Sequence, residues 1–236
     1  MRPTIPATLS ASPVTELQPG MFRRILLSGL IAGILAGLVA TAVQYVSLAP
    51  LIRSAERREA AAAHATAAEH HGWEPATELQ QTGYSLLANC LAGIGFGLML
   101  SAGLALGGRV DLGRGLLWGM AGYLAWSLAP ALGLPPELPG SAAAELGLRQ
   151  AWWLGTAIAT SAGLGLLAFA RPPVLRLGGL ALIALPHLIG APQPASPGGA
   201  APEDLARAFA LVSLAMTGLF WLILGGVAAA AYRRLG

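Results

Sequence analysis

Histidine and carboxylate side chains gather in a few short segments of an otherwise apolar chain. The first of these segments carries His64, Glu69, His70 and His71. Imidazole and carboxylate ligands together suit divalent first-row ions such as cobalt, nickel or zinc, and the lack of thiolates argues against a copper(I) site. Its spacing does not complete a site, because His64 and His71 lie roughly 10 Å apart along a helix and His70 and His71 point in different directions. A solvated helix that contains histidines is the alternative interpretation.

Two further segments each place one candidate ligand beside proline. Glu137 lies in Pro135-Pro136-Glu137-Leu138-Pro139-Gly140, where the prolines restrict the backbone and so hold the carboxylate in place. His187 follows Pro186 at the end of an apolar run, and ionisable residues at such positions are candidates for function. The alternatives are a simple turn at Glu137 and a histidine satisfied by a backbone carbonyl.

Polar groups within the apolar runs are few. Asn89 is the best candidate for a buried polar step on a pathway, and Gln44 is a second. Cys90 is the only cysteine, so no intrachain disulfide can form.

Composition indicates that a membrane must position these residues. The chain of 236 residues is 55% hydrophobic and 11% charged, with a mean hydropathy of +0.64, which leaves too little polar surface for a soluble globule. Crossing the hydrocarbon layer takes about 20 helical residues. We therefore predict an all-α transmembrane bundle of about six spans, the fifth of them short. The predicted spans are residues 25–49, 84–107, 115–134, 150–170, 177–190 and 208–232.

Arginine positions predict the orientation of this bundle, because cytoplasmic flanks collect positive charge. With both ends in the cytoplasm, the inner side has nine arginines against two carboxylates, and the outer side has five arginines against nine carboxylates and all four histidines. Dropping the fifth span would move Arg233 and Arg234 outward, so we keep it. The same distribution explains the basic character of the chain without nucleic acid, because the arginines flank apolar spans.

The chain divides into a leader and a single membrane domain. Residues 1–20 are rich in proline and predict a disordered leader, residues 21–236 form the transmembrane domain, and residues 51–81 form its longest outer loop. The first span could instead be a signal peptide cleaved after Ala42, but the apolar run continues to Ala49. Glycines at four-residue spacing, such as Gly29, Gly33 and Gly37, predict close helix packing.

Enzyme signatures are missing from the sequence. All 14 basic residues are arginine, so no Gly-rich, Lys-containing phosphate loop is present. There is no His-Glu-x-x-His or Gly-x-Ser-x-Gly motif, and no pair of carboxylates lies within the spans. We expect no enzyme and no permanently bound cofactor.

Several short motifs follow one another along the chain. They are Met21-Phe22-Arg23-Arg24, the histidine-bearing loop, Pro136-Glu137-Leu138-Pro139-Gly140, Arg149-Gln150-Ala151-Trp152-Trp153 and Pro186-His187-Leu188-Ile189-Gly190-Ala191-Pro192. In this order they resemble the CbtA family of predicted cobalt transporter subunits. The resemblance covers residues 21–236. It implies a multi-pass protein of the bacterial inner membrane that takes up cobalt for cobalamin synthesis beside a small single-span CbtB-type subunit.

The residues and the resemblance together give one functional hypothesis. Outer histidines and carboxylates capture Co²⁺ as the transported ion, and the helix bundle passes it inward. The expected metal ligands are His187, Glu137, His64, His70, His71 and Glu69, and the expected pathway residues are Asn89 and Gln44. A non-transporting membrane scaffold that binds a partner is the alternative, and the lipid bilayer is a partner in either case. The sequence leaves a homo-oligomer open.

Overall fold

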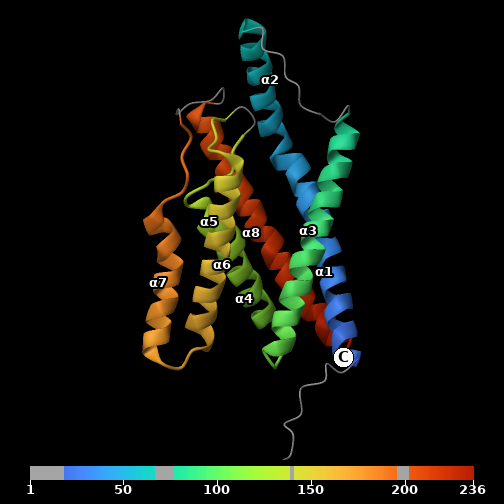
Figure 1. Ribbon diagram of the computed structural model, residues 1–236. Helices are drawn as coiled ribbons and strands as arrows, with labels where there is room; N and C mark the ends of the chain where they lie inside the picture. The colour runs from blue at the N-terminus through green and yellow to red at the C-terminus, as the bar shows by residue number, and fades with distance from the viewer. Residues whose placement is uncertain (1–18, 67–76, 139–140, 196–201) are drawn as a thin grey trace, which may run out of the picture.

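The computed structural model describes residues 19–66, 77–138, 141–195 and 202–236, and these residues form a bundle of helices (Figure 1). The prediction of an all-α membrane bundle is confirmed. In chain order the elements are α1 (Pro19–Ser47), α2 (Ala49–Thr66), α3 (Glu78–Leu106), α4 (Leu112–Tyr123), the π-helical turn η1 (Leu124–Leu128), α5 (Ala129–Ala131), α6 (Leu146–Phe169), α7 (Pro173–Ile189) and α8 (Glu203–Arg234).

Four of the predicted spans are helices long and apolar enough to cross a membrane. These are residues 20–47 of α1, together with α3, α6 and α8. The predicted span 115–134 corresponds to α4, η1 and α5, which continue one another from Leu112 to Ala131. The predicted short span 177–190 corresponds to α7, whose 17 residues extend about 26 Å. Gly190, with φ of 89°, ends α7 in a conformation that favours glycine.

The π-helical turn has a local cause in the sequence. The Ala129 N–H donates to the Leu124 carbonyl, one residue further back than in an α-helix. Pro130 follows directly and has no N–H to give to the preceding turn. The helix therefore already lacks the backbone hydrogen bond that residue 130 would donate. The wider turn is accommodated at this point of the segment formed by α4, η1 and α5.

Glycines let three pairs of helices touch along their backbones. Gly33 of α1 meets Gly93 of α3, and Gly163 of α6 meets Gly179 of α7. Gly225 of α8 lies against Gly115 and Gly119 of α4 with no room for a side chain between them. Small residues permit this close approach. Van der Waals packing then holds the helices together, because the hydrophobic effect does not drive their association within lipid. The predicted packing role of the glycine repeats is confirmed.

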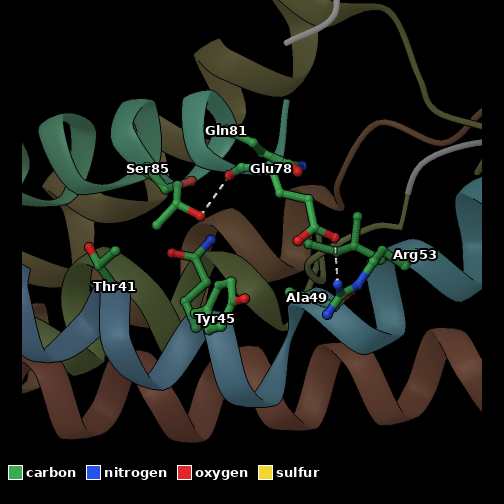
Figure 2. A pocket seen from close by; sticks show the side chains of 10 residues that line it. Thr41, Tyr45, Ala49, Arg53, Glu78, Gln81 and Ser85 are labelled. Atoms are coloured by element: carbon green, nitrogen blue, oxygen red, sulfur yellow. Dashed lines mark hydrogen bonds and ion pairs between the residues drawn. The ribbon is translucent and has the colours of Figure 1, made fainter. Parts of the chain in front are cut away.

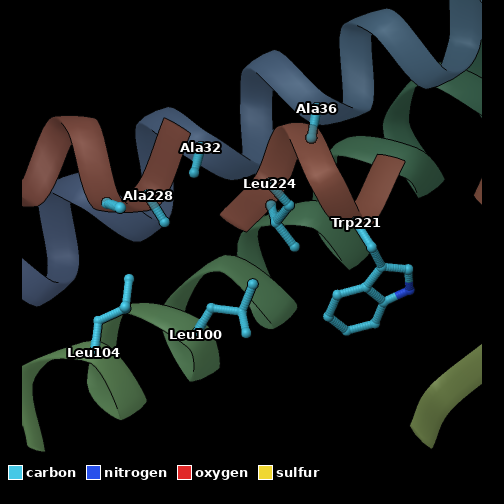
Figure 3. Close-up of a cluster of buried hydrophobic side chains, with 8 residues drawn as sticks. Ala32, Ala36, Leu100, Leu104, Trp221, Leu224 and Ala228 are labelled. Carbon is cyan, nitrogen blue, oxygen red and sulfur yellow. The ribbon is translucent and has the colours of Figure 1, made fainter. Parts of the chain in front are cut away.

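The core of the bundle lies between α1, α3 and α8. Figure 3 shows alanines of α1 and α8 facing Leu100 and Leu104 of α3, with Leu224 and Trp221 of α8 completing the cluster. Trp221 and Leu224 are 1% and 0% exposed. Because α1 packs in this core, it is an integral part of the bundle.

The two ends of the bundle carry different charges. Helices α1, α4 and α7 begin at one end, where α3, α6 and α8 finish (Figure 1, bottom). Among the described residues this arginine end holds Arg23, Arg24, Arg109, Arg114, Arg171, Arg176, Arg233 and Arg234, with Asp111 as its carboxylate. The opposite, acidic end holds Glu56, Glu78, Glu137, Glu145, Glu203 and Asp204, beside Arg53, Arg57, Arg58, Arg149 and Arg207.

Candidate functional site

A large cavity at the acidic end lies between the loop after α5, the start of α6 and the upper part of α8. It has a volume of about 590 Å³ and is open at the surface of the bundle. We call it the Glu137 cavity. Its polar lining residues are Ser127, Glu137, Arg149, Gln150 and Thr217, and its remaining walls include Pro135, Pro136, Trp153 and Leu214. A volume in this range is sufficient for a small ligand or for a hydrated ion.

Glu137 is held in this cavity from both sides along the chain. Pro135 and Pro136 precede it and fix the backbone φ angles. Leu138 follows it and is only 3% exposed, because its side chain packs with Leu48, which joins α1 to α2, and with Phe209 of α8. The Glu137 carboxylate therefore extends from a loop that the prolines and the packing of Leu138 hold in place. The proline motif predicts such a restraint.

Arg149 is the direct partner of Glu137. Its Nη2 donates to Glu137 Oε2 at 2.6 Å, and the two side chains are 27% and 28% exposed. The Arg149 Nε is buried without a hydrogen-bond partner among the described residues. Sequence reasoning did not identify this pair. The available signal was that Arg149 is the only arginine in the predicted second outer loop, twelve residues after Glu137.

Hydroxyl groups lie deeper in the Glu137 cavity. Ser127, which belongs to the π-helical turn, accepts a hydrogen bond from Trp221 Nε1 at 3.1 Å. Thr217 donates to the Ser213 carbonyl at 2.8 Å, so its oxygen remains available as an acceptor. Neither Thr217 nor Ser127 was among the site residues predicted from the sequence. These oxygens can hydrogen-bond to water molecules around an ion.

Aromatic rings stand between the Glu137 cavity and the arginine end. Trp153, which lines the cavity, meets Trp126 with ring centroids 5.8 Å apart. Trp126 in turn packs against Phe96 at 5.5 Å, and Phe96 packs against Trp221 at 4.7 Å. These four rings come from α3, η1, α6 and α8 and form an aromatic layer across the bundle.

His187 lies apart from this cavity. The half-buried ring is near the end of α7 and packs edge-on against Trp152 of α6, with centroids 6.0 Å apart. Trp152 Nε1 donates to the Pro186 carbonyl at 3.3 Å. Trp152 therefore connects α6 to the end of α7. His187 is not among the residues that line the Glu137 cavity.

The two predicted pathway residues do meet. Asn89 of α3 donates through Nδ2 to Gln44 Oε1 and to Thr41 Oγ1 of α1, both at 3.0 Å. Gln44 and Thr41 line a second, smaller cavity of about 60 Å³, where Arg53 and Glu78 form an ion pair at 2.8 Å (Figure 2).

The seam between α1 and α3 does not continue this second cavity inward. Gly37 lies against Cys90, and the contact between Gly33 and Gly93 follows one turn later. The backbones touch at both levels and leave no passage between them. In this conformation the hydrogen bonds of Asn89 join the two helices, as polar side chains commonly do within membranes.

No metal site is complete in the part of the chain that the structure describes. No group of three or more histidine, cysteine, aspartate or glutamate side chains comes together there. His64 belongs to α2, but its side chain and residues 69–71 lie outside the described part. The proposed ligation by His64, Glu69, His70, His71, Glu137 and His187 therefore stays a prediction. Glu203 and Asp204 lie in the first turn of α8, where their charge favours the helix N-terminus, but Pro202 is the capping residue.

Comparison with known proteins gives one match. The family model described as "Probable cobalt transporter subunit (CbtA)" matches residues 22–233, which is nearly the whole chain. No curated protein and no solved structure matches the chain.

Proposed function

Because the chain belongs to the CbtA family of probable cobalt transporter subunits, we propose that it is the membrane-spanning subunit of a system that imports Co²⁺ across the bacterial inner membrane. The acidic end faces outward in this proposal and the arginine end faces the cytoplasm. The partner is a small single-span subunit of the CbtB type. The family description also favours a transporter subunit over an enzyme.

One observation carries this proposal, namely the charge difference between the two ends of the bundle. Arginines dominate the end at which both described termini lie, as expected of a cytoplasmic side. The open Glu137 cavity and most of the described carboxylates occupy the opposite end. This arrangement attracts a cation from outside, and a membrane potential that is negative inside favours its inward movement by roughly 2.3 kcal/mol per charge per 100 mV.

Capture in this mechanism begins with a hydrated ion. The described lining of the Glu137 cavity offers one carboxylate, two hydroxyls and an amide, which suit hydrogen bonds to the water shell of the ion better than complete replacement of that shell. Histidines of the outer loop would replace some of these waters, and His187, which does not line the cavity, would contact the ion outside it. The aromatic layer would then have to open before the ion could move further inward.

Metal binding is expected to weaken as the pH falls from 7.5 to 5.5. Only neutral imidazole binds a metal ion, and an ordinary histidine titrates near a pKa of about 6.5. Protonation therefore competes with the metal, and affinity should be highest at pH 7.5 and fall through the histidine range. Calorimetric titration of the purified protein with CoCl₂ in detergent at several pH values measures this. Equal affinity at pH 7.5 and 5.5 would rule out histidine ligation.

Replacing His187 with alanine is expected to lower cobalt accumulation more than replacing His64 with alanine. The position of His187 is fixed by the contact between α7 and Trp152. His64 is one of three histidines within one segment, so a neighbouring histidine can replace it as a ligand. Accumulated cobalt in cells expressing each variant is measured by elemental analysis at equal protein level. A larger loss for His64→Ala would reverse this ranking.

A further inference from the structure

The geometry of the Glu137 cavity points to a role for Arg149 that goes beyond the binding of the ion. We propose that Arg149 is an internal competitor of the cation: its guanidinium occupies Glu137 in the resting protein, and an arriving divalent ion must displace it. This inference rests on the proposed function, because it concerns the same cavity. It makes Arg149 a positioning residue that sets how tightly the cavity holds its ion.

Charge within the cavity supports this competition. Glu137 and Arg149 are the charged residues among those that line it, and they neutralise each other through the contact at 2.6 Å. With Arg149 in place, a divalent ion at Glu137 would meet a positive charge at close range. Such repulsion is substantial at a half-buried site, where solvent screens it only in part. Binding of the ion therefore requires the guanidinium to move away.

The Arg149 contact is suited to being broken. A guanidinium can bind a carboxylate through two parallel hydrogen bonds, but here the structure gives one, from Nη2, while the buried Nε has no partner among the described residues. Arg149 also lies in the first turn of α6, where the positive end of the helix dipole disfavours a cation. The guanidinium therefore needs a negative partner, and it can leave Glu137 only if another carboxylate takes over that role.

A second acceptor for the displaced guanidinium is close in sequence. Glu145 is the N-cap of α6 and precedes Arg149, which lies in the first turn of that helix, by four residues. Its carboxylate caps α6 by accepting the N–H groups of Gly147 and Leu148 at 2.8 and 3.0 Å, and it is exposed. The guanidinium can therefore move from Glu137 toward Glu145 while α6 stays in place.

Cobalt titrations of Arg149 variants test the competition. We expect R149Q, purified in detergent, to bind Co²⁺ roughly tenfold more tightly than the unchanged chain at the same ionic strength, because the competing charge is gone. R149K retains the charge and should bind within about threefold of the unchanged chain. E137Q/R149Q should lose the gain, because the competition concerns Glu137. Quenching of tryptophan fluorescence provides the readout, since Trp153 lines the cavity.

Each outcome of this test has a defined meaning. R149M serves as a second neutral variant in case R149Q does not fold, and melting temperatures show which variants are folded. Equal or weaker Co²⁺ binding by the folded neutral variants would overturn the competition, and so would tighter binding that persists in E137Q/R149Q. If neither the unchanged chain nor the neutral variants bind Co²⁺, the inference fails. The proposed function is then tested separately, by measuring cobalt uptake in cells that express the chain.

Discussion

Replacing Glu137 with glutamine is expected to reduce cobalt accumulation by cells roughly tenfold to a hundredfold. Glutamine keeps the size of the side chain but removes the charge that faces the ion. Hydrogen bonds to a charged group contribute about 1.5–3 kcal/mol, which corresponds to a loss of this order in affinity. Elemental analysis of washed cells, with the amount of protein in the membrane determined in parallel, measures the effect.

A matched variant separates a local effect from a general loss of negative charge at the acidic end. Glu203 lies at the same end of the bundle, its side chain is 92% exposed, and it does not line the Glu137 cavity. Glu203→Gln should therefore accumulate cobalt nearly as well as the unchanged chain. Similar losses for both variants would show that the cavity has no special role. Melting temperatures are needed because Glu137→Gln leaves the Arg149 charge without its partner.

The largest structural effect is expected from a single methyl group at Gly225. A Cβ there would overlap the Gly115 carbonyl oxygen and would lie 2.9 Å from the Gly119 Cα, so α4 and α8 would have to separate. Overpacking of this kind typically costs about 1–3 kcal/mol, and here the obstacle is backbone that cannot turn aside. We expect Gly225→Ala to lower the melting temperature of the detergent-solubilised protein and to reduce its yield from membranes.

The adjacent residue provides the control for this prediction. At Gly226 the nearest atoms to an added Cβ are side-chain ends of Leu112 and Leu116, both at 3.6 Å, which is ordinary contact. Gly226→Ala should leave the melting temperature unchanged or raise it, since alanine favours a helix by about 1 kcal/mol over glycine. If Gly225→Ala melted at the same temperature as Gly226→Ala, the glycine contact between α4 and α8 would not hold the bundle together.

The helices were largely predictable from the sequence because membrane physics leaves few choices. An uncharged run of sufficient length must be helical to satisfy its backbone, and arginines mark where it ends. The predicted spans accordingly coincide with α1, α3, α6 and α8 within a few residues. The glycine spacing also predicted which faces would pack, although the identity of each partner helix required the structure.

Two features of the fold were not predicted. The π-helical turn at Leu124–Leu128 lies within an apolar run whose hydropathy resembles that of its neighbours, and Pro130 is its local sign. The hydrogen bond from Trp152 to the end of α7 joins residues 34 positions apart, and it follows from no local pattern.

The candidate site was predictable in its residue types but not in its pairing. Proline spacing predicts that Glu137 is fixed in place, and the structure adds the buried side chain of Leu138 as an anchor that its sequence position does not reveal. Arg149 was assigned to the outer side with no partner, because a sequence gives no distance between two loop residues. The sequence singled out Asn89 and Gln44 as polar residues within spans but did not predict their contact, and the structure shows that Asn89 joins α3 to Gln44 and Thr41 of α1.

Uptake of radiolabelled cobalt tests the central claim most directly. Cells without their own cobalt importer would express the chain alone, the chain with its small single-span partner, or Glu137→Gln with the same partner, at matched protein levels. Our account predicts uptake above that of control cells for the chain with its partner, and a rate close to the control for Glu137→Gln. Control-level uptake by the folded, membrane-inserted chain both alone and with the partner would contradict the account.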